Sequence, residues 1–302
     1  MRVTLLHNAG AGDDDQPDAP QLIELIRSAG HAVSYRSTDD DDWVRALNEP
    51  ADVIAVAGGD GTIGRVAKRM AGRRIPLGVL PMGTANNISH TLGVADLPLE
   101  RLIAGWQLDR TRRLDIGVVL GPWGMHRFIE GLGVGVFAWT IPEADASGTL
   151  ANLEAADHKI AYALQMLKDH LQACPPIALR ATLDGDDLSG EYLLFEAMNI
   201  QYIGPNLYLA PHADPGDGQL DVVMVTNSER ERLIDYLSSW QNGEFRRPHL
   251  PTRRGQRLAV EWTGFHVHSD DRIWPDEGAM PPAPAPIDVT IEAHAVTFLS
   301  PV

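Results

Sequence analysis

Cysteine is almost absent from this chain of 302 residues, in which Cys174 is the only one. A single cysteine excludes disulfides within the chain and any zinc site built from several thiolates. The N-terminal stretch has the pattern of a first β-strand and carries no cleavable export signal, so this cysteine usage predicts a cytoplasmic protein. Because Cys174 ends a helical pattern just before two prolines, we interpret it as a packing residue and not as a nucleophile.

Long apolar runs and positive charge are also scarce. No uninterrupted apolar stretch reaches about 18 residues, so the sequence predicts no membrane-spanning helix. There are 25 Lys and Arg against 41 Asp and Glu, a net charge of −16. Such a chain is repelled by nucleic-acid phosphates, which counts against nucleic-acid binding, and by anionic membranes. Because the sequence has neither a polybasic run nor a lipidation signal, we expect only transient, peripheral membrane contact through a local apolar or basic patch.

The pattern of apolar residues changes along the chain. In the first third, apolar strand patterns such as residues 53–57 and 75–80 alternate with helical patterns such as residues 63–70. This alternation predicts a doubly wound parallel sheet with helices on both faces. Later residues form many short β patterns separated by turn residues, which predicts a β-rich, sandwich-like domain. We therefore predict an α/β nucleotide domain at residues 1–112 and a β-rich acceptor domain at residues 113–302, whose last strand can return to the first domain.

The strongest chemical signal is a glycine-rich loop with the sequence GGDGT. It follows a buried strand pattern and opens a helix. Glycines let the backbone approach a ligand closely, and the N–H groups at the start of a helix attract phosphate. A tight strand-to-helix turn would need fewer glycines, so we predict a phosphate-binding loop. Its candidate residues are Gly58, Gly59, Asp60, Gly61 and Thr62.

Two common phosphate-binding motifs are disfavoured by what is missing around this loop. Residues 59–64 fit the dinucleotide pattern G-x-G-x-x-G, which requires an acidic residue about 20 positions further on to bind ribose. That region reads LPMGT at residues 80–84 and has no acid before Asp96. The P-loop pattern G-x-x-x-x-G-K-[ST] does not occur. These absences count against a dehydrogenase and exclude a P-loop enzyme.

A second polar loop, PMGTANN, follows the strand pattern that comes next along the chain. The carboxyl ends of parallel strands meet at one edge of a sheet, so this loop and the GGDGT loop should form one polar cleft. Gly83, Thr84 and Asn86 are its candidate ligand residues. The alternative is a purely local role, in which Thr84 caps a helix and the asparagines cap turns.

Together, GGDGT and the later P-x-G-T-x-N-N segment resemble the diacylglycerol kinase catalytic family, which includes bacterial lipid kinases and sphingosine kinases. Residues 209–221, LAPHADPGDGQLD, are similar to a third segment of that family, so the resemblance covers nearly the whole chain. It implies an ATP-dependent enzyme that transfers the γ-phosphate to a hydroxyl of diacylglycerol or a related lipid alcohol. It also implies an active site between an α/β domain and a β-rich domain.

The resemblance assigns further site residues. Asn8 lies in a loop similar to the family's first phosphate-side loop, with Ala9 in place of a proline, and Thr38 matches a threonine beside the nucleotide. The family holds Mg²⁺ at positions that correspond to Asp214, Asp217 and Gln219. The alternative for this last set is a plain Asp-Gly turn between two strands.

The segment near the end of the chain departs from the family. There the family has a strand followed by D-G-E, whose aspartate is the general base, whereas this chain reads Asp270-Asp271-Arg272. The resemblance implies that Asp270 is the base, with Asp271 and Asp276 as competing carboxylates and a solvated β-turn as the alternative. His268 and its neighbour two residues earlier lack a third metal ligand, and we interpret them as surface or packing residues.

Two other functions stay open. A kinase that acts on NAD would share the GGDG loop, although its N-x-G-x-L-G-F segment is missing here. A catalytically silent nucleotide- or lipid-binding protein is favoured by the altered residues 270–272 and by Asn87, where many members of the family have aspartate. The sequence does not identify the acceptor lipid, and it leaves a homodimer open.

Overall fold

The computed structural model describes residues 1–12, 16–153, 155–276 and 280–300. The chain forms two compact units. Unit 1 consists of Met1–Leu114 with His294–Val302, and unit 2 consists of Asp115–Ala293. Strands β5 (Thr111–Gly121) and β17 (Ala285–Leu299) contribute residues to both units.

Unit 1 is built on a parallel sheet in which β4, β3, β1 and β2 are neighbours in that order. The end of β17 runs parallel to β4, with Phe298 opposite Leu77. Every residue of β3 is buried, as expected for a central parallel strand with both faces covered. The strand bounds are Arg2–His7 for β1, Ala32–Ser37 for β2, Val53–Gly58 for β3 and Leu77–Pro81 for β4.

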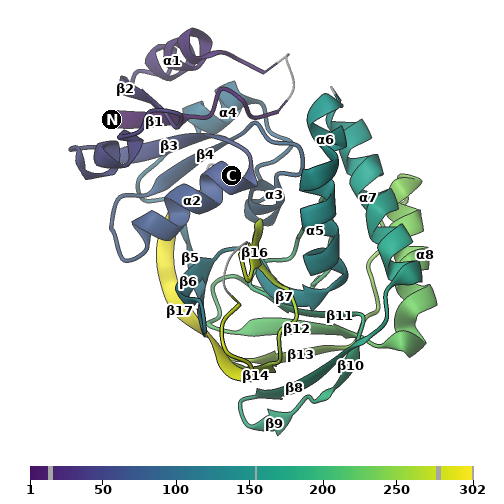
Figure 1. Ribbon diagram of the computed structural model, residues 1–302. Coiled ribbons are helices and arrows are strands. Elements are labelled where there is room, and N and C mark those ends of the chain that lie inside the picture. The colour runs from purple at the N-terminus through teal and green to yellow at the C-terminus, as the bar shows by residue number, and fades with distance from the viewer. Residues whose placement is uncertain (13–15, 154, 277–279, 301–302) are drawn as a thin grey trace. The chain divides into compact units, whose positions relative to one another are not determined.

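Helices cover both faces of this sheet, which confirms the doubly wound prediction. Figure 1 shows α1 and α4 on one side of the strands and α2 on the other. Leu22 and Ile26 of α1 pack with Leu102 and Ile103 of α4 in one core cluster, which also contains Leu5 of β1. The apolar residues Trp43, Val44 and Leu47 follow an acidic run in a pattern that predicts a helix, and the structure forms a short 3-10 segment there. The bounds are Ala19–Ser28 for α1, Trp43–Asn48 for the 3-10 segment η1, Asp60–Met70 for α2, Asn87–Leu92 for α3 and Leu99–Ala104 for α4.

Unit 2 contains two antiparallel sheets. The first is six-stranded, in the order β13-β12-β11-β7-β15-β16. In the second, β10, β8, β14 and β17 are neighbours, with β9 beside β8 and the β5–β6 hairpin beside β17. The remaining bounds are Gly124–Phe128 for β6, Gly131–Gly135 for β7, Ile177–Leu183 for β8, Asp186–Asp187 for β9, Gly190–Tyr192 for β10, Leu194–Met198 for β11, Leu220–Val225 for β12, Thr252–Gly255 for β13, Leu258–Trp262 for β14, Val267–Ser269 for β15 and Arg272–Trp274 for β16.

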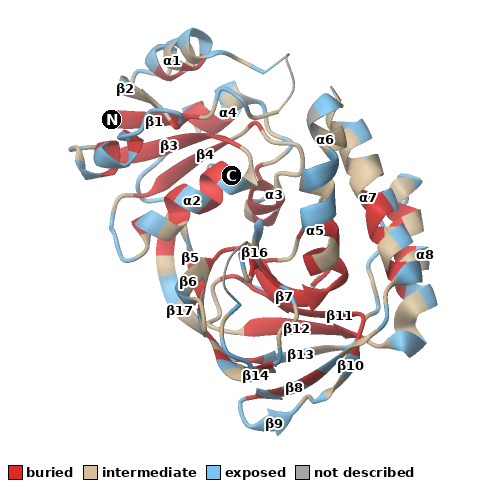
Figure 2. Cartoon of the chain, viewed as in Figure 1, coloured by how far each residue is buried: buried red, intermediate tan, exposed pale blue. Residues whose placement is uncertain are grey.

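The core of unit 2 lies on both faces of the six-stranded sheet. One cluster joins alternate residues of the two sheets, such as Val134 and Val222 with Ala181 and Val260, and confirms the predicted sandwich. On the other face, Leu194 and neighbouring residues pack against helices. Figure 2 shows that α7 and α8 combine buried and exposed residues, as helices on a sheet surface do. The bounds are Val136–Ser147 for α5, Thr149–Asn152 for α6, Ala156–Ala173 for α7, Asn227–Glu229 for the 3-10 segment η2 and Arg230–Gln241 for α8.

Two elements of unit 2 differ from the sequence-based expectation. The sequence Gly131–Gly135 has a low intrinsic strand preference, yet it forms the central strand β7. Helix α5 was not expected, because its apolar residues do not recur at helical spacing. Within the described part of the chain, no helix combines the length and apolar content needed to cross a bilayer.

Candidate functional site

The two predicted glycine loops of unit 1 touch each other at the carboxyl edge of the parallel sheet. A Cβ atom built on Gly59 would lie 2.9 Å from the Cα of Gly83, and one built on Gly83 would lie 2.4 Å from the Cα of Gly59. A side chain at either position would collide with backbone. The loops after β3 and β4 therefore meet through glycines, which brings bare backbone to this edge.

The loop after β1 joins them. Gly12 has φ +83°, and a Cβ atom there would lie 2.3 Å from the carbonyl oxygen of Met82. The side chain of Asn8 fixes this loop, because its Nδ2 donates to Thr62 Oγ1 at 3.0 Å and its Oδ1 accepts from the N–H of Gly10 at 3.1 Å. Asn8 thus connects the first loop to the first turn of α2.

Two predicted ligand residues support the loops with their side chains. Asp60 Oδ1 accepts from the N–H of Ile88 at 2.9 Å, which fastens the start of α2 to α3. Asn86 Oδ1 accepts from the N–H of Gly83 at 2.9 Å, and Asn86 Nδ2 donates to the carbonyl of Gly83 at 2.8 Å. Asn86 itself has φ +54°, a conformation that asparagine tolerates better than most residues. These bonds hold the glycine backbone in place.

The same edge is suited to an anion. Gly59 caps α2 and has no side chain, so no side-chain oxygen occupies the position in front of the helix dipole. Gly61 is exposed in the first helical turn, and Thr84 is half-buried in the second loop. Thr38, directly after β2, is buried, and its hydroxyl oxygen has no hydrogen-bond partner among the described residues. This bare-backbone surface fits the phosphates of a nucleotide, and the role of each residue stays a prediction.

In unit 2, Asp270 lies in the turn between β15 and β16 with φ +51°. Its Oδ1 accepts from the N–H groups of Ile129 at 3.0 Å and Glu130 at 2.9 Å. Asp271, at the tip of the turn, and Asp276 are both exposed. Among the residues that the structure describes, backbone N–H groups hold Asp270 and neither of the two competing carboxylates. Residues 277–278, which follow Asp276, lie outside the described residues.

Behind this turn lies a buried pair of a carboxyl and an imidazole group that sequence reasoning missed. His268 Nε2 is 2.8 Å from Glu196 Oε2, and His268 Nδ1 is 3.2 Å from the carbonyl oxygen of Asp270. The two side chains are 1% and 0% exposed. A Cβ atom on Gly133 would lie 2.0 Å from Glu196 Oε2, so the glycines of β7 make room for the carboxylate. The one signal in the sequence was a single acid inside the apolar run LLFEAM.

Burial and pairing shift the proton affinities of this pair. Burial raises the pKa of the Glu196 carboxyl above its ordinary value. Burial alone would lower the pKa of His268, but Glu196 and Asp270 together outweigh it, and the pKa of His268 lies above its ordinary value. His268 Nδ1 faces a carbonyl oxygen, which can only accept, so this nitrogen carries a proton.

The predicted magnesium residues lie on the turn before β12. Asp217 Oδ1 accepts from the N–H of Gln219 at 2.9 Å, and its Oδ2 forms an ion pair with Arg254. Asp214 is exposed. The buried carboxylate of Asp115, which the sequence analysis did not consider, accepts from the N–H of Gly218 at 2.7 Å and fixes the turn.

The carboxylate of Asp217 is engaged by a cation of the protein itself. Arg254 already neutralises Asp217, and its Nε also lies 3.5 Å from Asp221 Oδ2. Among the residues that the structure describes, no three His, Cys, Asp or Glu side chains converge as a metal site. The magnesium assignment of Asp214, Asp217 and Gln219 therefore stays a prediction.

A magnesium titration of the nucleotide-free protein tests this point. Because Arg254 supplies the positive charge beside Asp217, we expect Mg²⁺ to leave the melting temperature unchanged. In Arg254→Met, the uncompensated carboxylates should give a rise in melting temperature with Mg²⁺. A Mg²⁺-dependent rise in the parent that Asp217→Asn removes would instead support the magnesium set. Differential scanning calorimetry with and without Mg²⁺ measures these shifts.

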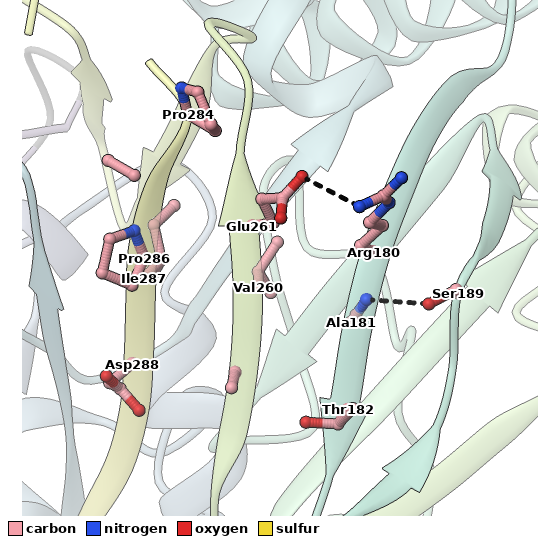
Figure 3. A pocket seen from close by; sticks show the side chains of 12 residues that line it. Arg180, Ala181, Thr182, Ser189, Val260, Glu261, Pro284, Pro286, Ile287 and Asp288 are labelled. Carbon is pink, nitrogen blue, oxygen red and sulfur yellow. Dashed lines mark hydrogen bonds and ion pairs between the residues drawn. The ribbon is translucent and has the colours of Figure 1, made fainter. Parts of the chain in front are cut away.

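A pocket of about 430 Å³ in unit 2 holds none of the predicted site residues. It lies on strands β8, β14 and β17, where Figure 3 shows Arg180 beside Glu261 and the N–H of Ala181 beside Ser189. The ion pair spans 3.7 Å and is largely exposed. Nothing in this pocket resembles a phosphate cradle or a positioned base.

Comparison with known proteins identifies families for both parts of the chain. Residues 2–119 match the diacylglycerol kinase catalytic domain, and residues 142–298 match the YegS C-terminal NAD kinase beta sandwich-like domain. The diacylglycerol kinase of Mycobacterium tuberculosis (strain ATCC 25618 / H37Rv) is 25% identical over 280 residues, covering 90% of this chain and 85% of the relative. A probable YegS-like lipid kinase of Pseudomonas aeruginosa (strain UCBPP-PA14) is 30% identical over 252 residues, covering 80% and 78%.

Solved structures agree on the fold. A diacylglycerol kinase from Bacillus anthracis str. Sterne superposes with a TM-score of 0.71 at 19% identity, covering 99% of this chain and 96% of the other. Yeast NADH kinase gives a TM-score of 0.53 at 8% identity, covering 99% and 83%. At these identities the two structures support the fold alone. The domain matches and the relatives show that the chain is a transferase that belongs to the diacylglycerol kinase family of lipid kinases.

Proposed function

We propose that this lipid kinase transfers the γ-phosphate of ATP to a hydroxyl of diacylglycerol or a related lipid alcohol. The observation that carries the proposal is the contact between Gly59 and Gly83, which presents bare backbone in front of the first turn of α2. Such a surface can cradle phosphates. The names of the relatives, diacylglycerol kinase and probable lipid kinase, support a lipid acceptor.

The residues of the chain have distinct parts in this proposal. The glycines of residues 58–61 and Gly83 approach the phosphates, while Asn8, Asp60 and Asn86 hold the loops that carry them. ATP supplies the phosphoryl group when bound, and transfer of this kind depends mainly on positioning and electrostatic stabilisation. Residues 1–112 would bind the nucleotide and residues 113–302 the acceptor. In the second of these domains, Asp270 would accept the proton of the acceptor hydroxyl.

An NAD kinase is the competing enzyme, because the C-terminal family match and the yeast structure share its fold. Transfer of labelled phosphate from ATP to diacylglycerol, to other lipid alcohols and to NAD distinguishes the acceptors. We expect labelled lipid and no labelled NADP. Labelled NADP without labelled lipid would overturn the proposal, and ATP binding without any transfer would favour a silent binding protein.

Substitution of Gly61 tests the phosphate loop. We expect Gly61→Val to weaken ATP binding by about 100-fold or more, because its side chain would displace the phosphates from the first turn of α2. The position is exposed, so the fold should persist. The matched control is Arg65→Val, exposed one turn later on the same helix, which should bind ATP like the parent. Calorimetric titration with ATP measures the affinity of both variants. An unchanged affinity in Gly61→Val would show that the loop is a plain turn with no role in ATP binding.

A further inference from the structure

Unit 1 contains a pocket of about 760 Å³, which lies at the edge of the sheet opposite the glycine loops. It is lined by Asp52 just before β3, by the segment from Gly72 to Pro76 just before β4, and by residues near the start of β5 and in β17. The strands β3 and β4 are parallel, so their amino ends form this edge and their carboxyl ends carry the phosphate loops. A strand of five residues separates the two edges by roughly 17 Å, so the pocket is distinct from the nucleotide loops.

Positive charge dominates the lining of this pocket. Arg73, Arg74 and Arg113 contribute three guanidinium groups, and Asp52 is the one carboxylate among the lining residues. That carboxylate is already paired, because Arg2 approaches Asp52 Oδ1 at 2.8 Å. The pocket therefore has a net positive charge within a chain of net charge −16.

The arginines of this pocket are available to a ligand. Arg73 is oriented by hydrogen bonds from its Nη1 to the carbonyl oxygen of Leu47 at 2.8 Å and to Asn48 Oδ1 at 3.0 Å. Arg74 and Arg113 are exposed, and neither has a hydrogen-bond or ion-pair partner among the described residues. A guanidinium group presents paired donors that match the oxygens of a phosphate. The pocket thus combines one oriented and two unpaired phosphate-binding groups.

Apolar surface lies beside these charges. Leu108 lines the pocket with 51% of its surface exposed, and the half-buried Ile75 lines it as well. A small soluble phosphate compound would leave Leu108 in water. An anionic lipid offers a phosphate group to the arginines and an apolar layer to the leucine in the same approach.

We propose that this pocket binds the phosphate headgroup of an anionic phospholipid and is a membrane-contact site of the enzyme. A lipid kinase meets its acceptor at a bilayer, and an acidic chain needs a local basic patch to approach an anionic one. The patch is not visible as a polybasic run in the sequence, because the fold assembles it from residues 73–74 and Arg113. The proposal rests on membership of the lipid kinase family and requires no particular role for the glycine loops or Asp270.

Sedimentation with phosphatidylcholine vesicles that contain phosphatidic acid tests the site. We expect Arg74→Gln/Arg113→Gln to bind these vesicles roughly 30-fold more weakly than the parent, since each basic residue near an anionic surface contributes about fivefold. The matched control is Arg27→Gln/Arg101→Gln, which removes two exposed arginines of unit 1 outside the pocket and should bind like the parent. Equal losses in both double variants would overturn the proposal, because only net charge would then matter.

Three further measurements separate the lipid from other ligands and binding from catalysis. Leu108→Gln should also weaken vesicle binding, whereas inorganic phosphate, which offers no apolar layer to Leu108, should bind the parent too weakly to raise its melting temperature. Specific stabilisation of the parent by inorganic phosphate, with no vesicle binding, would overturn the lipid assignment. If the double variant does not fold, the single variants Arg74→Gln and Arg113→Gln should each show about a fivefold loss of vesicle binding.

The double variant Arg74→Gln/Arg113→Gln should phosphorylate a water-soluble short-chain diacylglycerol as fast as the parent. A failure of the proposed function would therefore appear in both proteins.

Discussion

Asp270→Asn is expected to lower turnover by about two to four orders of magnitude, the usual loss when a general base is removed. Asparagine has nearly the same shape as aspartate, and its Oδ1 can still accept from the N–H groups of Ile129 and Glu130. The turn should therefore keep its conformation while the group that accepts the proton is lost. Steady-state assays with diacylglycerol measure the loss, and calorimetry should give an ATP affinity and a melting temperature close to those of the parent.

The neighbouring acids provide matched controls for this prediction. Asp271 and Asp276 are exposed, and no backbone N–H group among the described residues holds either carboxylate. Asp271→Asn and Asp276→Asn should therefore retain near-parental turnover. An active Asp270→Asn together with an inactive Asp271→Asn would identify Asp271 as the general base. Full activity in all three variants would show that none of these carboxylates is the general base.

The parts of the site that sequence reasoning found are those with a local signature. Gly58 and Gly59 follow an apolar strand pattern directly, and Gly83 follows the next one. The topology of a parallel sheet then brings both loops to one edge, so their proximity follows from strand order alone. The structure adds that the two loops meet through glycine backbone, which no pattern of residue types reveals.

The parts that it missed depend on contacts between distant residues. Glu196 and His268 are 72 positions apart, and Asp115 contacts Gly218 across 103 positions. Periodicity reports which face of a strand is buried, but it does not report which residue of another strand lies opposite. For the same reason, His268 was interpreted as a surface or packing residue, whereas it is the buried partner of a carboxylate. The pairing of Asp217 with Arg254 across 37 positions belongs to the same class.

Removal of one partner of the Glu196–His268 pair is expected to have the largest effect on stability. His268→Leu should lower the free energy of unfolding by about 3–5 kcal/mol, because it leaves a buried carboxyl group without its partner. The double variant Glu196→Leu/His268→Leu should be less destabilised than His268→Leu, because no unpartnered carboxyl group then remains at this position. Denaturant unfolding measures these differences. Arg180→Leu is the control, because it removes one partner of an exposed pair in the same unit and should cost less than about 1 kcal/mol.

The pH dependence of the same variants tests the pair independently. In the unfolded chain His268 releases its proton near its ordinary pKa of 6.5, whereas in the folded protein Glu196 and Asp270 together raise the pKa of His268 above that value against the effect of burial. The stabilisation from this proton is therefore complete below pH 6.5 and is lost as the pH rises through the raised pKa. Relative to the double variant, the parent should lose unfolding free energy above pH 4.5, where the raised pKa of Glu196 takes effect, and again above pH 6.5 through His268. Each group contributes a slope of at most about 1.4 kcal/mol per pH unit. Parallel pH profiles for the two proteins would show that the pair does not hold this proton. Because His268 Nδ1 also bonds the carbonyl of Asp270, His268→Leu should in addition lower turnover more than Arg180→Leu does.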